Sequence, residues 1–399
     1  MNASVETIFK GVEDLNPRVP IADLVTTARF EAERDKIFRR SWLHVAHERE
    51  LPEPGSYVVK DVPPLAVSLL IMRGQDGTVR GFHNVCTHRG NKIAPSGSSG
   101  CKKVLACGFH GWSFTCEGKL HSVTDEKQFK ALDKSLLDLK PVNLETWEGH
   151  VFVNFEAKPR ETLKQWLGQL YGEYGGYFEQ HEVLNARVIH VKCNWNLAIN
   201  AFLEGYHTLY LHGKSVPDYQ GGPTNPERHR PFMEMFARHM RYSAPSNPHH
   251  QWTPAEEIAW RYGRQCLPAF DNDMTGMPVG VNPGKAQRWA FDVMELFPNI
   301  FWLLGNHFHV EAVFWPIDAD NTLIIGANYG YKSKTPAERL SQEFAQSRGR
   351  IVLREDLSTL EAQHAALKSG VLTHFQLSQQ EIAVQHHFRV ATDMLESRS

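Results

Sequence analysis

The chain has 399 residues, with 43 Lys and Arg against 45 Asp and Glu, six Cys and 21 His. This length favours two or three domains and allows a large core without disulfide bonds. The formal net charge of −2 provides no overall field that would attract nucleic acid or an anionic membrane. A hydrophobic content of 42% and a charged content of 22% exclude disordered, collagenous and coiled-coil classes.

Neither a membrane span nor a secretory signal is visible. The longest nearly apolar run, residues 63–72, is far shorter than the ~20 residues that a spanning helix needs. The N-terminus lacks the basic and apolar segments of a signal peptide. We therefore predict a cytoplasmic protein with no membrane partner, whose cysteines are reduced thiols, metal ligands or core residues.

Short β-type runs separated by Pro and Gly fill residues 41–155. They include residues 57–60, 65–72 and 150–155, each rich in branched or aromatic side chains. This pattern predicts a small all-β unit.

Helix starts and longer strands follow residue 159. Thr253-Pro-Ala-Glu256 and Thr335-Pro-Ala-Glu338 each combine an N-cap, a proline in the first turn and a glutamate that can complete a capping box. The second helix should run toward Leu367, with an interruption near Gly349. Strand-like runs lie between the two starts, at residues 299–304, 307–315 and 322–331. We predict a larger α+β domain with an antiparallel sheet.

Two Cys-His pairs carry the strongest chemical signal. Cys86-Thr-His88 is followed, after 18 intervening residues, by Cys107-Gly-Phe-His110. Two thiolates and two imidazoles on loops could bind zinc, or a [2Fe–2S] cluster with both Cys on one iron and both His on the other. Structural zinc sites favour closely spaced Cys pairs, whereas this Cys-x-His and Cys-x-x-His spacing favours the cluster. Buried cysteines and surface histidines are the alternative interpretation, against which the matched pairs argue.

The segments around these pairs, residues 81–90 and 107–118, resemble the Rieske domain of ring-hydroxylating oxygenase α subunits. Respiratory Rieske proteins match less well, because they carry a further disulfide-forming cysteine after each pair, where this chain has Asn91 and Phe109. The resemblance implies a [2Fe–2S] cluster bound by both Cys-His pairs. Cys101 and Cys116 lie outside the pairs and are expected to be ordinary core thiols.

The same resemblance implies a domain organisation. A Rieske domain over residues 41–155 would be inserted in a larger, helix-grip-like catalytic domain with an antiparallel sheet. That catalytic domain would consist of residues 1–40 and 156–399 and would hold a mononuclear non-heme iron.

A second group of polar side chains comprises Glu204, His207 and His212. On an ideal helix Glu204 and His207 share a face, but five residues turn His212 by roughly 140° from His207. Both histidines can therefore reach one metal only if the helix is distorted or ends there. Gly205 weakens a helix and Gly213 is typical of a C-terminal stop. Alone, two histidines in an aromatic core would be the simpler interpretation; their occurrence beside the Cys-His pairs favours ligation.

In the ring-hydroxylating family, two such histidines and a distant aspartate form a facial triad that leaves open positions on Fe(II) for dioxygen. The resemblance implies His207, His212 and Asp356 as the metal ligands. Glu355 competes with Asp356 as the third ligand, and solvated helix charges are the alternative for both acids. Asn200 is expected close to the iron without necessarily binding it.

Glu204 stands where most ring hydroxylases have aspartate. In that family the carboxylate joins a mononuclear-site histidine to a Rieske histidine of the neighbouring subunit, and the resemblance assigns this second role to His110. Glutamate occurs at this position in members that act on quaternary ammonium compounds, as well as elsewhere. The substrate class therefore stays open at this point.

The resemblance implies the terminal oxygenase of a multicomponent system, a mono- or dioxygenase that acts on an aromatic or polycyclic hydrophobic substrate in aromatic hydrocarbon catabolism. Electrons from NAD(P)H would arrive through a separate reductase, with or without a ferredoxin, since no Gly-x-Gly-x-x-Gly stands in a strand-helix context. The assembly would be a homotrimer or α3β3. Alternatives are a Rieske monooxygenase that N-demethylates a quaternary ammonium or acts on a steroid-like substrate, and a non-enzymatic Rieske electron carrier.

Overall fold

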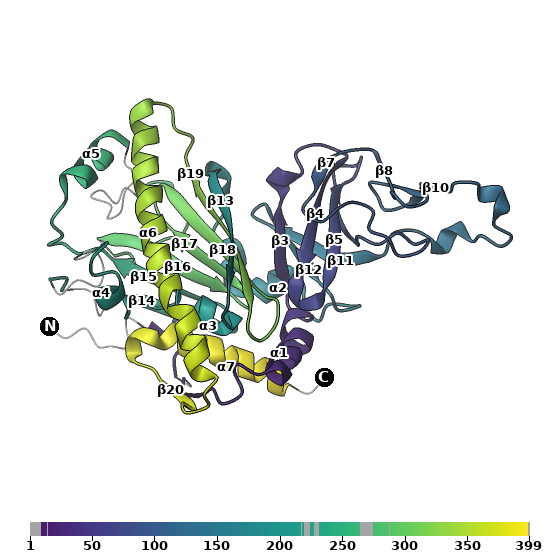
Figure 1. The fold of residues 1–399 in the computed structure, drawn as a ribbon. Coiled ribbons are helices and arrows are strands. Elements are labelled where there is room, and N and C mark those ends of the chain that lie inside the picture. Colours follow the sequence, from purple (N-terminus) through teal and green to yellow (C-terminus); the bar gives the residue numbers. More distant parts are fainter. Residues whose placement is uncertain are drawn as a thin grey trace. The chain divides into compact units, whose positions relative to one another are not determined.

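The computed structural model describes residues 9–13, 15–216, 218, 224–226, 231–263, 274–286 and 288–397. The chain forms two compact units (Figure 1), one made of Arg34–Gly168 and the other of Met1–Glu33 together with Gln169–Ser399. The smaller unit is therefore inserted between two segments of the larger one. Among the described residues, no helix has the length and apolar character needed to cross a bilayer.

Antiparallel strands build the smaller unit. Seven of them lie in the order β3-β12-β11-β6-β5-β4-β7. Their bounds are β3 (Leu43–His47), β4 (Ser56–Val62), β5 (Val67–Arg73), β6 (Val79–His83), β7 (Ser99–Cys101), β11 (Pro141–Trp147) and β12 (His150–Asn154). A second sheet contains β8 (Val104–Ala106), β9 (Ser113–Thr115) and β10 (Leu120–Ser122). The predicted all-β character of residues 41–155 is confirmed: the helical elements there are short 3-10 turns. One of them is Pro63–Leu65, where proline cannot donate to a strand ladder.

An eight-stranded sheet forms the centre of the larger unit, in the order β1-β14-β15-β16-β17-β18-β19-β13. Its strands are β1 (Phe9–Lys10), β13 (Glu182–Val191), β14 (Phe232–Met235), β15 (Met240–Pro245), β16 (Trp289–Leu296), β17 (Ile300–Leu304), β18 (Phe308–Pro316) and β19 (Thr322–Gly330). All neighbours are antiparallel except β1 and β14. The predicted antiparallel sheet is confirmed. A separate pair joins β2 (Arg18–Pro20) to β20 (His374–Gln376).

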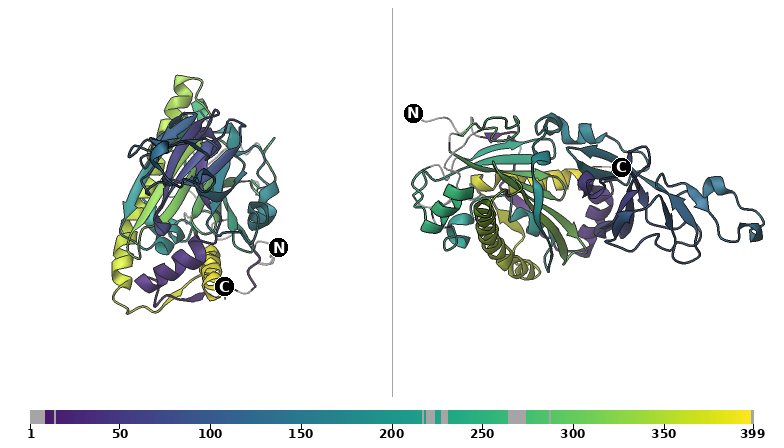
Figure 2. Two further views of the ribbon diagram at one scale, coloured as in Figure 1. Left: turned by 90° about the vertical axis from the view of Figure 1, so that its right-hand side faces the viewer. Right: turned by 90° about the horizontal axis from the view of Figure 1, so that it is seen from above.

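The helices are α1 (Thr27–Glu33), α3 (Trp195–Asn200), α4 (Thr208–Leu211), α5 (Pro254–Gly263), α6 (Pro336–Leu367) and α7 (Ile382–Glu396), with α2 (Leu163–Leu167) in the smaller unit. The long α6 crosses one face of the large sheet (Figures 1 and 2). Its predicted start is confirmed, because the Thr335 side chain accepts a hydrogen bond from the Glu338 N–H.

The predicted interruption of α6 at Gly349 is wrong. The helix continues through this residue for 32 residues in all. One glycine costs only about 1 kcal/mol relative to alanine, and the helix is held along its length by contacts with α5 and β13. Gly349 also lines a cavity beneath the helix, where a missing side chain leaves space.

Asp292, on β16, is a buried acid that should make stability depend on pH. Its carboxylate accepts hydrogen bonds from the Asn282 N–H and the Trp289 Nε1–H, both at 2.7 Å. Burial nevertheless raises the pKa of Asp292 to about 6. The folded protein therefore keeps this proton to higher pH than the unfolded chain does, and stability is lost as pH rises from the unfolded value toward 6.

We expect the unfolding free energy of the wild type, relative to that of Asp292→Asn, to fall by roughly 2 kcal/mol between pH 4 and pH 7. Urea unfolding at several pH values measures this difference. Asp393→Asn, a change at an exposed aspartate of the same unit, is the control and should leave the pH profile unaltered. Parallel profiles for the wild type and Asp292→Asn would contradict the assignment.

Candidate metal centres and substrate cavity

Two loops of matching geometry carry the Cys-His pairs. In each loop the cysteine N–H donates to the carbonyl of the fifth residue after it, at 2.7 Å for Cys86 and 2.8 Å for Cys107. The N–H of the fourth residue donates back to the cysteine carbonyl, at 2.9 and 3.0 Å. These fourth residues, Gly90 and Gly111, have φ values of 80° and 73°, which glycine adopts without strain. The local sequence therefore fixes both loops in the same shape.

The side chains of the two pairs lie together. Cys86 and Cys107 are only 2% and 3% exposed. The rings of His88 and His110 are 4.6 Å apart, and His88 stacks on Trp112 at 4.5 Å. The buried Nδ1 of His88 has no hydrogen-bond partner in the described part of the chain. Since buried polar atoms normally have a partner, this nitrogen fits a metal ligand.

Local electrostatics favour the ligand forms of Cys107 and His88, whereas burial disfavours the thiolate of Cys86. Burial raises the pKa of Cys86, and burial alone would do the same at Cys107. At Cys107, however, backbone N–H groups and the Asn91 amide, 3.6 Å from its sulfur, lower the pKa overall. Burial and nearby positive charge lower the pKa of His88, which keeps its imidazole neutral. Two thiolates and two neutral imidazoles are the donor set that a Rieske cluster requires.

The second histidine pair lies at a break between helices. Helix α3 ends at Asn200 and α4 begins at Thr208, so that His207 and His212 stand at the two ends of α4. The expected interruption of the helix is confirmed. Across the short helix α4, the Nε2 atoms of the two histidines lie 3.2 Å from each other.

Asp356, on α6, completes a group of three. Its Oδ1 lies 2.9 Å from His212 Nε2 and 3.4 Å from His207 Nε2, and the three candidate ligand atoms lie within 4.8 Å of one another. Despite this proximity, Oδ1 has no partner in hydrogen-bond geometry among the described residues. Three potential ligand atoms that converge this closely, one of them a carboxylate oxygen without a hydrogen-bond partner, fit a shared cation.

Two glutamates lie on the outer sides of the histidines. Glu204 Oε1 is 2.6 Å from His207 Nδ1, and Glu355 Oε2 is 2.8 Å from His212 Nδ1. Glu355 also accepts a hydrogen bond from Ser215 Oγ at 2.6 Å. A histidine that donates its Nδ1–H to a carboxylate presents the Nε2 lone pair to a metal. From the sequence, Glu355 was predicted to be either a competing metal ligand or a solvated helix charge; no spacing pattern signalled its contact with His212.

The carboxylates around His207 create a site for positive charge. Burial disfavours the charged imidazolium, but Asp356 and Glu204 outweigh it and raise the pKa of His207 to about 10. The carboxylates therefore favour a positive charge at this position. Fe(II) is suited by two imidazoles and one carboxylate.

Asn200 is the last residue of α3 and is 8% exposed. Neither atom of its side-chain amide has a hydrogen-bond partner in the described part of the chain. It is not among the residues that line the cavity beside the triad. Its proximity to the iron stays a prediction.

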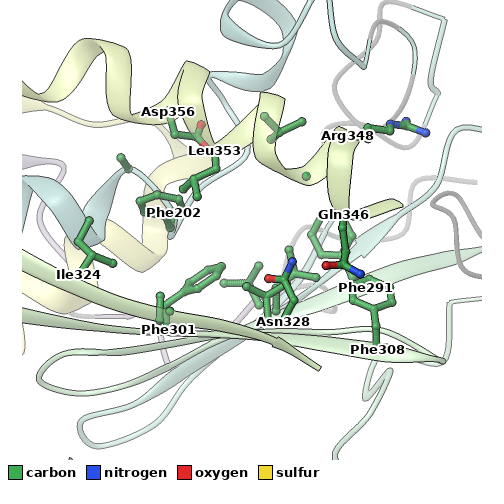
Figure 3. Close-up of a pocket in the computed structure, with 18 of the residues that line it drawn as sticks. Phe202, Phe291, Phe301, Phe308, Ile324, Asn328, Gln346, Arg348, Leu353 and Asp356 are labelled. Atoms are coloured by element: carbon green, nitrogen blue, oxygen red, sulfur yellow. The ribbon is translucent and has the colours of Figure 1, made fainter. Parts of the chain in front are cut away.

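A cavity of about 280 Å³ adjoins the group of His207, His212 and Asp356. Alternate residues of the strands face it, as the two-residue period of a strand dictates. Phe301 and Leu303 of β17 line the cavity, while Trp302 between them is buried and donates to Glu311 at 2.9 Å. Strand β17 thus contributes both to the cavity wall and to the core. Figure 3 shows Phe202 and Leu353 near Asp356.

The catalytic domain of ring-hydroxylating α subunits matches residues 178–397, and the Rieske [2Fe–2S] domain matches residues 41–142. The chain therefore belongs to the ring-hydroxylating α-subunit family of Rieske oxygenases. It is the terminal oxygenase of such a system, an oxidoreductase whose cofactors are a Rieske [2Fe–2S] cluster and a mononuclear iron.

Relatives with two kinds of activity are similar to this chain. The carnitine monooxygenase oxygenase subunit of Acinetobacter baumannii is 30% identical over 298 residues, which cover 74% of this chain and 70% of that protein. The large oxygenase component of a naphthalene 1,2-dioxygenase system from Pseudomonas aeruginosa is 32% identical over 200 residues, covering 47% and 42%. A quaternary ammonium Rieske monooxygenase shares the fold, with a TM-score of 0.76 at 20% identity and coverage of 97% and 99%.

Proposed function

We propose that this terminal oxygenase inserts oxygen from O2 into an aromatic or polycyclic hydrophobic substrate. The observation that carries this proposal is the cavity, whose walls beside the triad are formed by side chains such as Phe202, Phe301 and Phe314. Walls of this kind bury an apolar substrate and exclude water from the reacting centre. Such a substrate places the enzyme in aromatic hydrocarbon catabolism.

In this proposal the two metal centres have named ligands. The cluster is held by Cys86, His88, Cys107 and His110, and the iron by His207, His212 and Asp356. When bound, the cluster supplies electrons singly and the iron activates dioxygen. The protein orients the imidazoles through Glu204 and Glu355 and keeps the cavity dry.

We further propose a separate NAD(P)H-dependent reductase, with or without a ferredoxin, and a homotrimeric or α3β3 assembly in the cytoplasm. The naphthalene-oxidising relative is named as one component of a system, and the related quaternary ammonium monooxygenase is described with inter-subunit electron transfer. Next to Glu204, the side chains of Tyr206 and Tyr210 are 53% and 85% exposed. Exposed aromatic side chains are typical of protein interfaces, which supports a neighbouring subunit at this position.

A second candidate is N-demethylation of a quaternary ammonium compound. It is favoured by Glu204, which stands in place of the commoner aspartate, and by the similarity to carnitine monooxygenase. The aromatic walls could also contact a cation through their ring faces. Among the described residues, Glu204 and Asp356 are the acidic side chains that line the cavity, and both lie at the triad.

Purified oxygenase, reconstituted with a reductase and a ferredoxin, decides between these candidates. We expect naphthalene or biphenyl to stimulate NADH and O2 consumption, with an oxygenated product identified by mass spectrometry. Coupled turnover of γ-butyrobetaine or carnitine alone would instead favour the second candidate. A Rieske EPR signal without substrate-dependent O2 consumption would indicate an electron carrier, and zinc in place of iron would contradict both metal assignments.

A further inference from the structure

The cavity has a polar end that the proposed function leaves unexplained. Arg187 of β13 lines the cavity and lies opposite Gly326 of β19. A Cβ at residue 326 would come within 3.4 Å of the Arg187 Nε. The glycine therefore makes room for the arginine side chain on the cavity side of the sheet.

Arg187 has no acidic partner among the residues that the structure describes. Its Nη1 donates to the neutral Asn185 Oδ1 at 3.3 Å, and no ion pair with a described carboxylate involves it. Arg348 also lines the cavity, but it donates to Glu256 at 2.5 Å, and its guanidinium points away from the cavity in Figure 3. A half-buried guanidinium with a neutral partner alone is an uncompensated charge, which proteins seldom retain without a use.

Neutral amides surround this charge. The Asn185 Nδ2 donates to the Gln346 Oε1, and Asn185 lies opposite Asn328 in the sheet. The buried Oδ1 of Asn328 has no hydrogen-bond partner in the described part of the chain. Figure 3 shows Asn328 and Gln346 across the cavity from Asp356. We call the cavity-lining residues Arg187, Asn328 and Gln346, together with Asn185, which hydrogen-bonds Arg187 and Gln346, the amide end of the cavity; it carries a positive charge and no acid.

We infer that the substrate carries a carboxylate and that Arg187 binds this carboxylate at the amide end of the cavity. The remainder of the substrate, which we call its body, lies beside the triad. A guanidinium matches a carboxylate with two parallel hydrogen bonds, and the neighbouring amide side chains carry no negative charge. The inference rests on the proposed function, because it assumes that the substrate occupies this cavity.

Charge around Arg187 supports the same conclusion. Burial lowers the pKa of Arg187, and the positive charge of Arg350 lowers it further. A bound carboxylate would offset both effects. The body that carries the carboxylate is either an aryl group or a trimethylammonium group. The aromatic walls of the cavity can contact both kinds of group. The inference therefore concerns the anionic end, and the experiment separates the two bodies.

Binding to the intact enzyme under nitrogen tests the inference by calorimetry, with two matched pairs of probes. One pair is 4-phenylbutyrate and its primary amide, and the other is γ-butyrobetaine and its primary amide. We expect the carboxylate of at least one pair to bind about tenfold more tightly than its amide, as a charge-assisted hydrogen bond provides. The pair that shows this preference identifies the body.

Arg187→Gln should remove the preference, whereas Arg187→Lys should keep part of it. Arg350→Gln is the matched control, because it removes the same charge from an exposed residue that hydrogen-bonds Ser347 and does not line the cavity. It should leave the preference within about twofold. Should Arg187→Gln fail to fold, Arg187→Lys and Arg187→Met are compared in its place.

Equal binding of carboxylate and amide in both pairs, or absence of carboxylate binding, would overturn the inference. The same holds if Arg187→Gln and Arg350→Gln reduce the preference equally. Failure of the proposed function has a different signature: the carboxylate preference persists in the binding assay, but no probe stimulates O2 consumption in the reconstituted system.

Discussion

Replacing Asp356 with alanine is expected to release the mononuclear iron and reduce substrate oxygenation to background, while the Rieske cluster stays intact. Asp356 supplies the anionic oxygen next to the Nε2 atoms of His207 and His212. Without it, two neutral imidazoles face Fe(II), and a site without the carboxylate of the triad no longer compensates the metal charge. Iron quantification, EPR of the reduced cluster and coupled turnover measure the three properties separately.

The adjacent acid provides the matched control. Glu355→Gln keeps an oxygen that can accept the His212 Nδ1–H, so we expect the iron to be retained with an affinity about 10–100-fold lower. His207→Ala should behave like Asp356→Ala. Loss of iron in Glu355→Gln together with normal iron in Asp356→Ala would mean that Glu355, and not Asp356, is the third ligand.

These two centres differ in how far the sequence could predict them. Each Cys-His loop is closed by hydrogen bonds within five residues, with Gly90 or Gly111 at its turn. The interactions that shape each loop are therefore local, and the spacing of the Cys and His residues was sufficient to propose a cluster. The break between α3 and α4 also has a local cause, because it contains Gly205, which weakens a helix.

Asp356 and the amide end depend on contacts between distant segments. Asp356 reaches the histidines because α6 crosses the sheet, and only the family resemblance singled it out from the neighbouring Glu355. Arg187 and Asn328 meet through the register of β13 with β19, and Gln346 comes from a helix turn above them. Each looks like an ordinary surface or strand residue in the sequence. The error at Gly349 has a related cause, since tertiary contacts sustain a helix that local propensity would interrupt.

Glu204→Gln is expected to slow electron transfer from the Rieske cluster to the mononuclear iron by at least about tenfold, with both metals retained. The Glu204 carboxylate is held within its own loop: Oε1 contacts His207 Nδ1 at 2.6 Å, while Oε2 accepts the backbone N–H groups of Tyr206 and His207. Every one of these partners is a donor when His207 presents Nε2 to a metal. A glutamine has one oxygen, so its NH2 group must face a donor and one contact is lost.

The measurement is a single turnover of reduced enzyme, in which the cluster absorbance is followed after O2 and substrate are added. Glu204→Asp retains two oxygens and is the residue that most ring hydroxylases carry, so it should preserve more of the rate than Glu204→Gln despite its shorter side chain. Tyr210→Phe, a change at an exposed neighbour on α4, controls for disturbance of the loop surface. A single-turnover rate in Glu204→Gln equal to that of the wild type would exclude this carboxylate from the path between the metals, because its contact with His207 is the link to the iron that the structure provides.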